Sequence, residues 1–119
     1  MTADTSGQFD SAIQACKDIF LAKMKDYGTA WRVLRPESLT DQIYIKANRI
    51  RSIQGKGSHL VIEDEWPEFI GIINYSIIAL IQLELGIGND TKLSPKEIEQ
   101  YYDKYVNAAK SLMMDKNHD

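Results

Sequence analysis

The sequence predicts an all-α protein with four helices in a bundle-like arrangement. Apolar residues recur at steps of three and four in four separate segments, which is the period of one face of a helix. Glycine-containing stop signals separate most of these segments, and none shows the apolar–polar alternation of a half-buried strand. The chain has 119 residues, the length of one domain, and we expect residues 1–119 to form a single all-α domain.

The first helix is expected from about Gln8 to Lys25, followed directly by Gly28 as a C-terminal stop. Six apolar residues lie on one helical stripe and are expected to pack in the core: Phe9, Ile13, Cys16, Phe20, Met24 and Tyr27. For Tyr27 the alternative to core packing is a role at a binding site.

The second helix is expected to open at Ser38, which forms a weak capping box with Asp41. It should run to about Gln54, because Gly55 begins a stretch that breaks the helical pattern. Its buried side is marked by Ile43, Ala47 and Ile50.

The third helix is expected to open in the acidic stretch 63–65, where carboxylates suit the positive end of the helix dipole. Pro67 is tolerated if it lies in the first turn, since the first amides have no partner within the helix. Apolar residues lie on nearly every side through Leu85, which is typical of a central, buried helix. The run Phe69–Ile81 is shorter than the roughly 20 residues needed to cross a bilayer, so we expect no membrane span.

The fourth helix, over about 94–115, has the strongest start signal. Ser94, Pro95 and Glu97 combine an N-cap, a proline at the first position and a capping-box glutamate. Apolar residues then continue at helical spacing to Met113.

Composition and charge exclude several classes of protein. The 14 basic and 17 acidic side chains give a net charge of −3, whereas a protein that binds DNA in bulk needs a basic surface. Cys16 is the one cysteine, so a disulfide scaffold is excluded. The stretch Met1–Asp10 is polar where a secretory signal would be basic and then apolar. We therefore expect a cytoplasmic protein.

Charge is segregated along the chain. The segment 32–56 is rich in lysine and arginine, and the segment 63–68 contains four carboxylates and no basic residue. One interpretation is two solvated faces that pair with each other. The other is a site in which carboxylates hold a divalent metal and cations hold phosphate.

Helical spacing defines this candidate site. Lys46 and Arg49 lie one turn apart on one face of the second helix, at the edge of its buried side. Glu65 and Glu68 lie one turn apart on the third helix, and Asp64 neighbours Glu68 at the i, i+4 position. Carboxylate oxygens arranged in this way can hold Mg²⁺.

Two further residues of the third helix call for an explanation. Gly71 costs about 1 kcal/mol relative to alanine inside a helix, so a close approach of another element or of a ligand is expected there. Asn74 is a polar group in an apolar run and must be hydrogen-bonded if it is buried. Its partner is either a neighbouring helix or a substrate or metal ligand.

Several short strings together resemble one family of bacterial and phage proteins, the first of a numbered series of nucleotide-modification-associated domains. The resemblance covers about residues 10–86. It rests on Lys25–Gly28, Ala30–Arg32 with Arg35, Ser38–Ile43, Ile45–Ala47, Arg49–Arg51, Glu65, Glu68–Phe69 and Gly71–Tyr75.

The layout is more distantly similar to the MazG-like all-α nucleoside triphosphate pyrophosphatases. That resemblance implies a Mg²⁺-dependent hydrolase that converts a nucleoside triphosphate to a monophosphate and pyrophosphate, and by analogy a homodimer. The broader group carries E-x-x-E on one helix and E-x-x-D on the next. Glu65 and Glu68 match the first pattern, and no second E-x-x-D occurs at a matching place.

The resemblance assigns expected roles to ten residues. Glu65 and Glu68 would be catalytic and would coordinate Mg²⁺ together with Asp64 and Asp26. Lys46, Arg49, Arg32 and Asn74 would contact the substrate, with Tyr27 and Trp31 stacking on its base.

Other functions stay open at this point. One is a non-catalytic module that binds nucleotides, as the absence of the second acidic pattern would allow. Another is a helical interaction protein in a DNA-modification or phage-conflict system.

Overall fold

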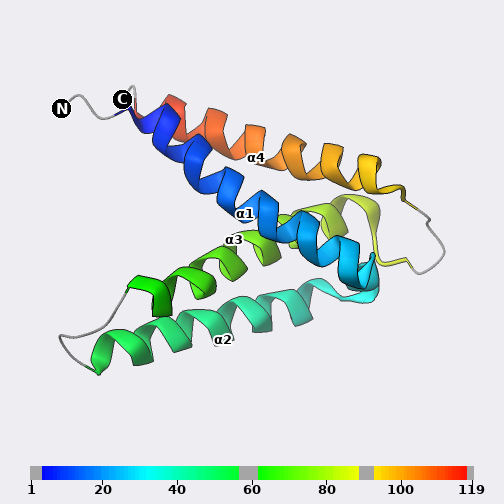
Figure 1. Ribbon diagram of the computed structural model, residues 1–119. Helices are drawn as coiled ribbons and strands as arrows, with labels where there is room; N and C mark the ends of the chain where they lie inside the picture. The colour runs from blue at the N-terminus through cyan, green and yellow to red at the C-terminus, as the bar shows by residue number, and fades with distance from the viewer. Residues whose placement is uncertain (1–3, 57–61, 89–92, 118–119) are drawn as a thin grey trace. The chain divides into compact units, whose positions relative to one another are not determined.

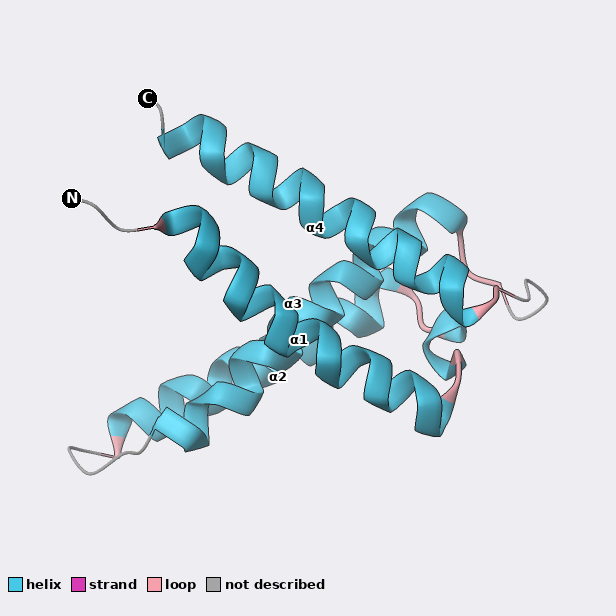
Figure 2. Ribbon diagram, turned by 45° about the horizontal axis from the view of Figure 1, so that its top comes forward, coloured by secondary structure: helices cyan, strands magenta, loops and turns pink. Residues whose placement is uncertain are grey.

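The computed structural model describes residues 4–56, 62–88 and 93–117, which are helical apart from short connections (Figure 1). The side chains of residues 62–64 and 117 also lie outside the described part of the structure. The elements are α1 (Thr5–Tyr27), the 3₁₀ helix η1 (Ala30–Val33), α2 (Pro36–Gly55), α3 (Ile62–Leu85) and α4 (Pro95–Asn117). Over the described ranges no strand occurs (Figure 2), so the all-α prediction with four long helices is confirmed.

The chain divides into two compact units. Unit 1 contains α1 and α4, and unit 2 contains η1, α2 and α3. Within each unit the two long helices run antiparallel, as Figures 1 and 2 both show. That residues 1–119 form a single domain stays a prediction.

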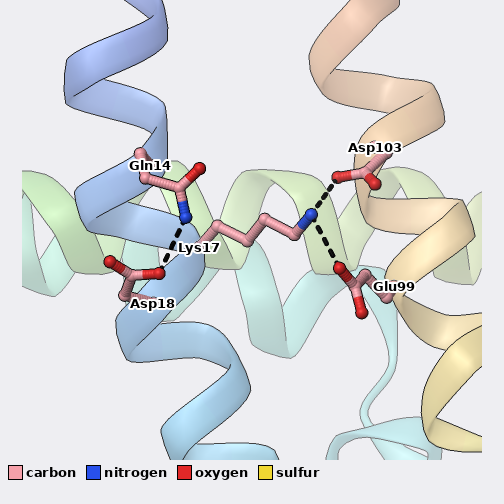
Figure 3. Close-up of polar contacts among 5 residues, drawn as sticks. All are labelled: Gln14, Lys17, Asp18, Glu99 and Asp103. Carbon is pink, nitrogen blue, oxygen red and sulfur yellow. Dashed lines mark hydrogen bonds and ion pairs between the residues drawn. The ribbon is translucent and has the colours of Figure 1, made fainter.

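Unit 1 has an aromatic and ionic contact surface between its helices. The rings of Phe20 on α1 and Tyr102 on α4 lie 4.7 Å apart between centroids, and both side chains are buried. Lys17 Nζ lies 2.9 Å from Glu99 Oε2 and 2.8 Å from Asp103 Oδ1 (Figure 3). One cation on α1 therefore joins two carboxylates that are one turn apart on α4.

Cys16 lies on the same stripe of α1 and is buried, as predicted. Burial raises the pKa of its thiol more than a backbone hydrogen bond lowers it. A thiol that stays protonated is a poor nucleophile, so a packing role fits this residue.

The ends of α1 and α4 follow the capping rules. Asp4 caps α1, since its Oδ1 accepts a hydrogen bond from Gly7 N, and this places the helix start a few residues before the predicted Gln8. Gly28 ends α1 with a φ of 63°, a conformation that favours glycine. Tyr27 is 74% exposed, so the expectation that it packs in the core is wrong.

The predicted capping box of α4 is present. Glu97 N donates to Ser94 Oγ at 3.1 Å, and Ser94 N donates to Glu97 Oε1 at 3.0 Å. The hydrogen bond from the Ser94 backbone, followed by that from its side chain, lowers the pKa of Glu97.

The predicted N-cap of α2, Ser38, is wrong by three residues. The helix begins at Pro36, with Arg35 at the N-cap and no side-chain capping bond. Proline at the first position has its φ already fixed near the helical value. Ser38 therefore lies inside the first turn instead of capping it.

Two expectations about α3 need correction. The helix begins at Ile62, which places Pro67 inside the helix beyond its first turn. Ile70, Ile77 and Ile81 are buried, but four apolar residues elsewhere on the helix are exposed: Trp66, Phe69, Leu80 and Leu83. The helix is therefore not covered on every side.

By length and composition alone, 21 residues of α3, Glu65–Leu85, are long and apolar enough to cross a membrane. The expectation of no membrane span rested on the length of the run Phe69–Ile81, and the helix extends beyond this run at both ends. The core helices of soluble proteins reach the same length and apolarity. Gln82 of α3 is buried, and its side chain forms hydrogen bonds with the segment before α2.

Candidate functional site

Lys46 of α2 lies across the surface of α3 at Gly71. A Cβ atom added to Gly71 would stand 2.5 Å from Lys46 Cε and 2.6 Å from Lys46 Cδ. Such a distance is a steric clash, so a larger residue would force the end of the lysine side chain to shift, and glycine lets it lie directly on the helix. The expected close approach at Gly71 is therefore confirmed, and the approaching group is a lysine side chain.

Glu68 and Tyr75 lie on either side of this crossing along α3. Lys46 Nζ is 3.8 Å from Glu68 Oε1 and 5.8 Å from the centre of the Tyr75 ring, within the range of a cation–π contact. The Lys46 and Glu68 side chains are only 19% and 18% exposed. The ammonium group is thus held between a carboxylate and an aromatic face.

Arg49 reaches the same carboxylate from one turn further along α2. Its Nη1 lies 3.5 Å from Glu68 Oε1, and the arginine side chain is 60% exposed. Lys46 and Arg49 were predicted to share a face of α2, and here both approach one oxygen atom of α3. We call Lys46, Arg49, Glu68 and Tyr75 the Lys46–Glu68 cluster.

Glu65 lies one turn before Glu68 and faces α2 as well. Gln54 Nε2 donates a hydrogen bond to Glu65 Oε2 at 3.0 Å. The two carboxylates that were predicted to act together are therefore both directed towards α2. Asp64 precedes them, and its side chain lies outside the described residues.

Asn74 is buried, as expected for a polar group that needs a hydrogen-bond partner. It directly precedes Tyr75 on α3, so the two residues point to different sides of the helix.

Trp31 and Arg32 lie in η1 and help to hold unit 2 together. Arg32 is 3% exposed, and its guanidinium donates to Gln82 Oε1 and to the carbonyl of Gly86 at the end of α3. Gln82 Nε2 in turn contacts the carbonyls of Trp31, Arg32 and Leu34. These bonds give Arg32 a structural role within the fold, separate from the Lys46–Glu68 cluster.

Asp26 and Tyr27 stand at the end of α1 and so belong to unit 1. Both side chains are exposed. Their expected roles in metal coordination and base stacking stay predictions, as do those of Trp31, Arg32 and Asn74.

Among the described residues, no three His, Cys, Asp or Glu side chains stand close enough to hold a metal ion together. Glu65 and Glu68 supply two carboxylates on one side of α3. Mg²⁺ in phosphate-binding proteins is commonly bound by one or two carboxylates, by water and by the phosphates of the substrate. Two carboxylates fit a metal ion that arrives with a nucleotide better than one held by the protein alone.

Two members of this region were missed from the sequence. Tyr75 lies four residues after Gly71 and seven after Glu68, a helical spacing that could have placed it beside Lys46. Gln54 had no comparable signal, because its partner Glu65 depends on the antiparallel register of α2 and α3.

A family model described as nucleotide modification associated domain 1 matches residues 23–83. The chain belongs to this family. The matched region of nucleotide modification associated domain 1 spans η1, α2 and most of α3, and it includes every residue of the Lys46–Glu68 cluster. Searches of curated proteins and of solved structures found no significant match to the chain. Similarity to the MazG-like pyrophosphatases stays an expectation.

Proposed function

We propose that unit 2 binds the phosphate groups of a free nucleotide together with Mg²⁺. The observation that carries the proposal is the convergence of Lys46 Nζ and Arg49 Nη1 on one oxygen of Glu68. Two cations that hold one carboxylate oxygen can hold a phosphate oxygen in the same way. The description of the family, which refers to nucleotide modification, supports a nucleotide as the source of the phosphate.

Glu68 has two roles in this proposal. Without a nucleotide it neutralises Lys46 and Arg49, whose positive charges would otherwise repel each other. With a nucleotide it would turn to the Mg²⁺ ion that accompanies the phosphates, joined by Glu65 one turn away. The site would then favour metal-bound polyphosphate over free phosphate.

The paired carboxylates also favour a second, catalytic function. Glu65 and Glu68 both face α2, on the side from which Lys46 and Arg49 approach. Cations placed there would offset the negative charge that grows on the phosphates in a hydrolytic transition state. The reaction would be the hydrolysis of a nucleoside triphosphate to a monophosphate and pyrophosphate.

The binding proposal is tested by removing the lysine charge and keeping its stem. Lys46→Met preserves the aliphatic contact with Gly71, and Arg51→Met on the exposed side of α2 is the matched control. We expect Lys46→Met to weaken binding of nucleoside triphosphates with Mg²⁺ by about tenfold or more, since hydrogen bonds to charged groups contribute roughly 1.5–3 kcal/mol. The measurement is isothermal titration calorimetry.

Arg51→Met should change this affinity less than twofold, by about 0.4 kcal/mol at most. Equal loss in both variants, or no binding of any common nucleoside triphosphate by the unmodified protein, would contradict the proposal.

Glu68→Gln separates the role of the metal from that of the cations. Without Mg²⁺, we expect this variant to bind pyrophosphate more tightly than the unmodified protein, because Lys46 and Arg49 lose their competing carboxylate. With Mg²⁺ the order should reverse. Release of pyrophosphate from a mixed nucleotide pool tests the hydrolysis, and its absence alongside Mg²⁺-dependent binding would leave the binding function alone.

Gly71→Ala probes the same site through shape alone. The added Cβ would displace the end of Lys46, so nucleotide affinity should fall about as far as in Lys46→Met. The helix itself should not weaken, because alanine is favoured over glycine by about 1 kcal/mol in a helix interior. Gly55→Ala is the control, since nothing lies within 4 Å of its added Cβ.

A further inference from the structure

Gln54 contacts one of the two carboxylates that the proposed function assigns to Mg²⁺. Its Nε2 donates a hydrogen bond from α2 to Glu65 Oε2 on α3, at 3.0 Å. The two residues are 11 apart in the chain, so the bond depends on how the two helices pack and not on a local turn. Gln54 is exposed and Glu65 is partly exposed, so a ligand can reach this pair from solvent.

Glu65 and Glu68 differ in the charge of their partners. Glu68 Oε1 lies 3.8 Å from Lys46 Nζ and 3.5 Å from Arg49 Nη1, and both of these groups are cations. The group that Gln54 presents to Glu65 is an amide, which is neutral. The cations therefore neutralise Glu68, whereas the hydrogen bond from Gln54 orients Glu65 and leaves its negative charge in place.

The hydrogen bond from Gln54 uses one oxygen of Glu65. An ionised carboxylate has two oxygens with about four lone-pair sites, so a metal ion can bind at Oε1 while Gln54 holds Oε2. Carboxylates that bind metal ions in proteins are themselves held by a second hydrogen-bonding group. Such a group fixes the direction in which the other oxygen points.

Gln54 reaches α3 at a different place from the two cations. It lies five residues after Arg49 and eight after Lys46. By the helical repeat, Gln54 is about 140° around α2 from Arg49 and about 7.5 Å further along the axis. A metal ion at Glu65 would therefore lie towards the end of α2, where the positive charges of the two cations repel it less.

We propose that Gln54 is a positioning residue for Mg²⁺. It orients Glu65 without neutralising it, so that Glu65 is the first protein group to bind the ion that arrives with the nucleotide. Glu68 joins once a phosphate has taken its place beside Lys46 and Arg49. This inference rests on the proposed function, and it adds which carboxylate holds the ion and which side chain keeps that carboxylate available.

Pyrophosphate binding with and without Mg²⁺ separates this role from a structural one. Gln54→Met keeps the length of the side chain and removes the donor. We expect it to weaken binding of the Mg²⁺–pyrophosphate complex by about tenfold, the lower end of the losses seen when a group that holds a metal ligand is removed. Binding of pyrophosphate without Mg²⁺ should change by less than about twofold, because Lys46 and Arg49 are unchanged. Isothermal titration calorimetry measures both affinities.

Gln54→Lys tests whether the partner of Glu65 has to be neutral. Lysine also donates hydrogen bonds, but it brings a positive charge to the place of the ion. The affinity for Mg²⁺–pyrophosphate should therefore fall at least as far as in Gln54→Met. Gln42→Met, at another exposed glutamine of α2, is the matched control and should bind both forms as the unmodified protein does. Far-ultraviolet circular dichroism should show unchanged helix content in all three variants, since both glutamines are exposed.

Equal losses with and without Mg²⁺ in Gln54→Met would indicate a structural role and would overturn the inference. Unchanged binding of Mg²⁺–pyrophosphate by Gln54→Met or by Gln54→Lys would overturn it as well. In each of these cases the proposed function would stand, provided that Mg²⁺ strengthens pyrophosphate binding by the unmodified protein. If Mg²⁺ has no such effect on the unmodified protein, the inference and the proposed function both fail.

Discussion

Gln82 shows how much one buried polar side chain organises in unit 2. It is 1% exposed, and its amide nitrogen lies 2.7 Å from the carbonyl oxygen of Leu34 and 2.8 Å from that of Arg32. Its amide oxygen accepts a hydrogen bond from the Arg32 guanidinium. One side chain of α3 therefore fixes the whole turn that leads into α2.

Gln82→Met is expected to lower the free energy of unfolding by about 2–4 kcal/mol. The substitution keeps the length of the side chain but leaves buried polar groups of Arg32 and Leu34 without this partner, and unpaired buried groups cost about 1–3 kcal/mol each. Urea denaturation followed by circular dichroism measures the change.

Gln42→Met, at an exposed position of α2, serves as the control and should change stability by less than about 0.5 kcal/mol. If both substitutions had the same small effect, Gln82 would not have the organising role that its hydrogen bonds indicate.

At the scale of the element, ion pairs join α1 and α4 in addition to the buried contact of Phe20 with Tyr102. Glu99 and Asp103 lie at the i, i+4 spacing on α4, where like charges destabilise a helix. Lys17 of α1 contacts both carboxylates and so offsets their repulsion (Figure 3). Lys110 of α4 forms a comparable contact with Asp10 of α1, so ion pairs join the two helices at separate points.

The raised pKa of Lys17 predicts that the free energy of unfolding depends on pH. Burial alone lowers its pKa, but hydrogen bonds and charge attraction from Asp103 and Glu99 outweigh this effect, and the net shift is upward from 10.5. A group whose pKa is raised on folding stabilises the folded state fully below its unfolded pKa. That contribution is lost as the pH rises through the folded value.

Lys17→Met should therefore lower stability by about 1 kcal/mol at pH 7, and the difference from the unmodified protein should shrink as the pH rises above 10.5. Urea denaturation at pH 7, 9 and 11 checks this. The exposed Lys23→Met, also on α1, is the control, with no such dependence expected. A difference that grew with pH would be inconsistent with the ion pair.

Those helix ends that are fixed by local bonds could be predicted from the sequence. The α4 start needed only Ser94, Pro95 and Glu97, and the α1 end needed only Gly28, because each signal acts within a few residues. The α2 start could not be placed from Ser38 and Asp41, since Pro36 also fits a first helical position. Two valid local signals competed, and the earlier one prevailed.

The side of α3 that stays open could not be predicted for a different reason. Apolar residues on every face leave no periodic signal to show which face has a partner. More of the candidate site could be predicted from the sequence. The spacing of Lys46 and Arg49 on α2 and the position of Glu68 on α3 follow from helical geometry. The contact of Glu65 with Gln54 depends on the register between helices, and spacing within one helix does not supply that information.

At the scale of the whole molecule, the net charge of −3 does not show how the basic and acidic residues are distributed. The basic segment lies on α2 and the acidic one at the start of α3, and the two meet within unit 2 through Lys46, Arg49 and Glu68. Three residues from the two oppositely charged segments are therefore brought together in space.

The division into two units has a consequence for the order in which the helix pairs form during synthesis. Arg49 and Glu68 are separated by 19 residues, whereas Asp10 and Lys110 are separated by 100. At a synthesis rate of about 5–20 residues per second, Lys110 is made about 5–20 s after Asp10. The α2–α3 pair can thus form on the ribosome while α1 still lacks α4. During that interval Phe20, on the apolar stripe of α1, lacks Tyr102, its aromatic partner on α4.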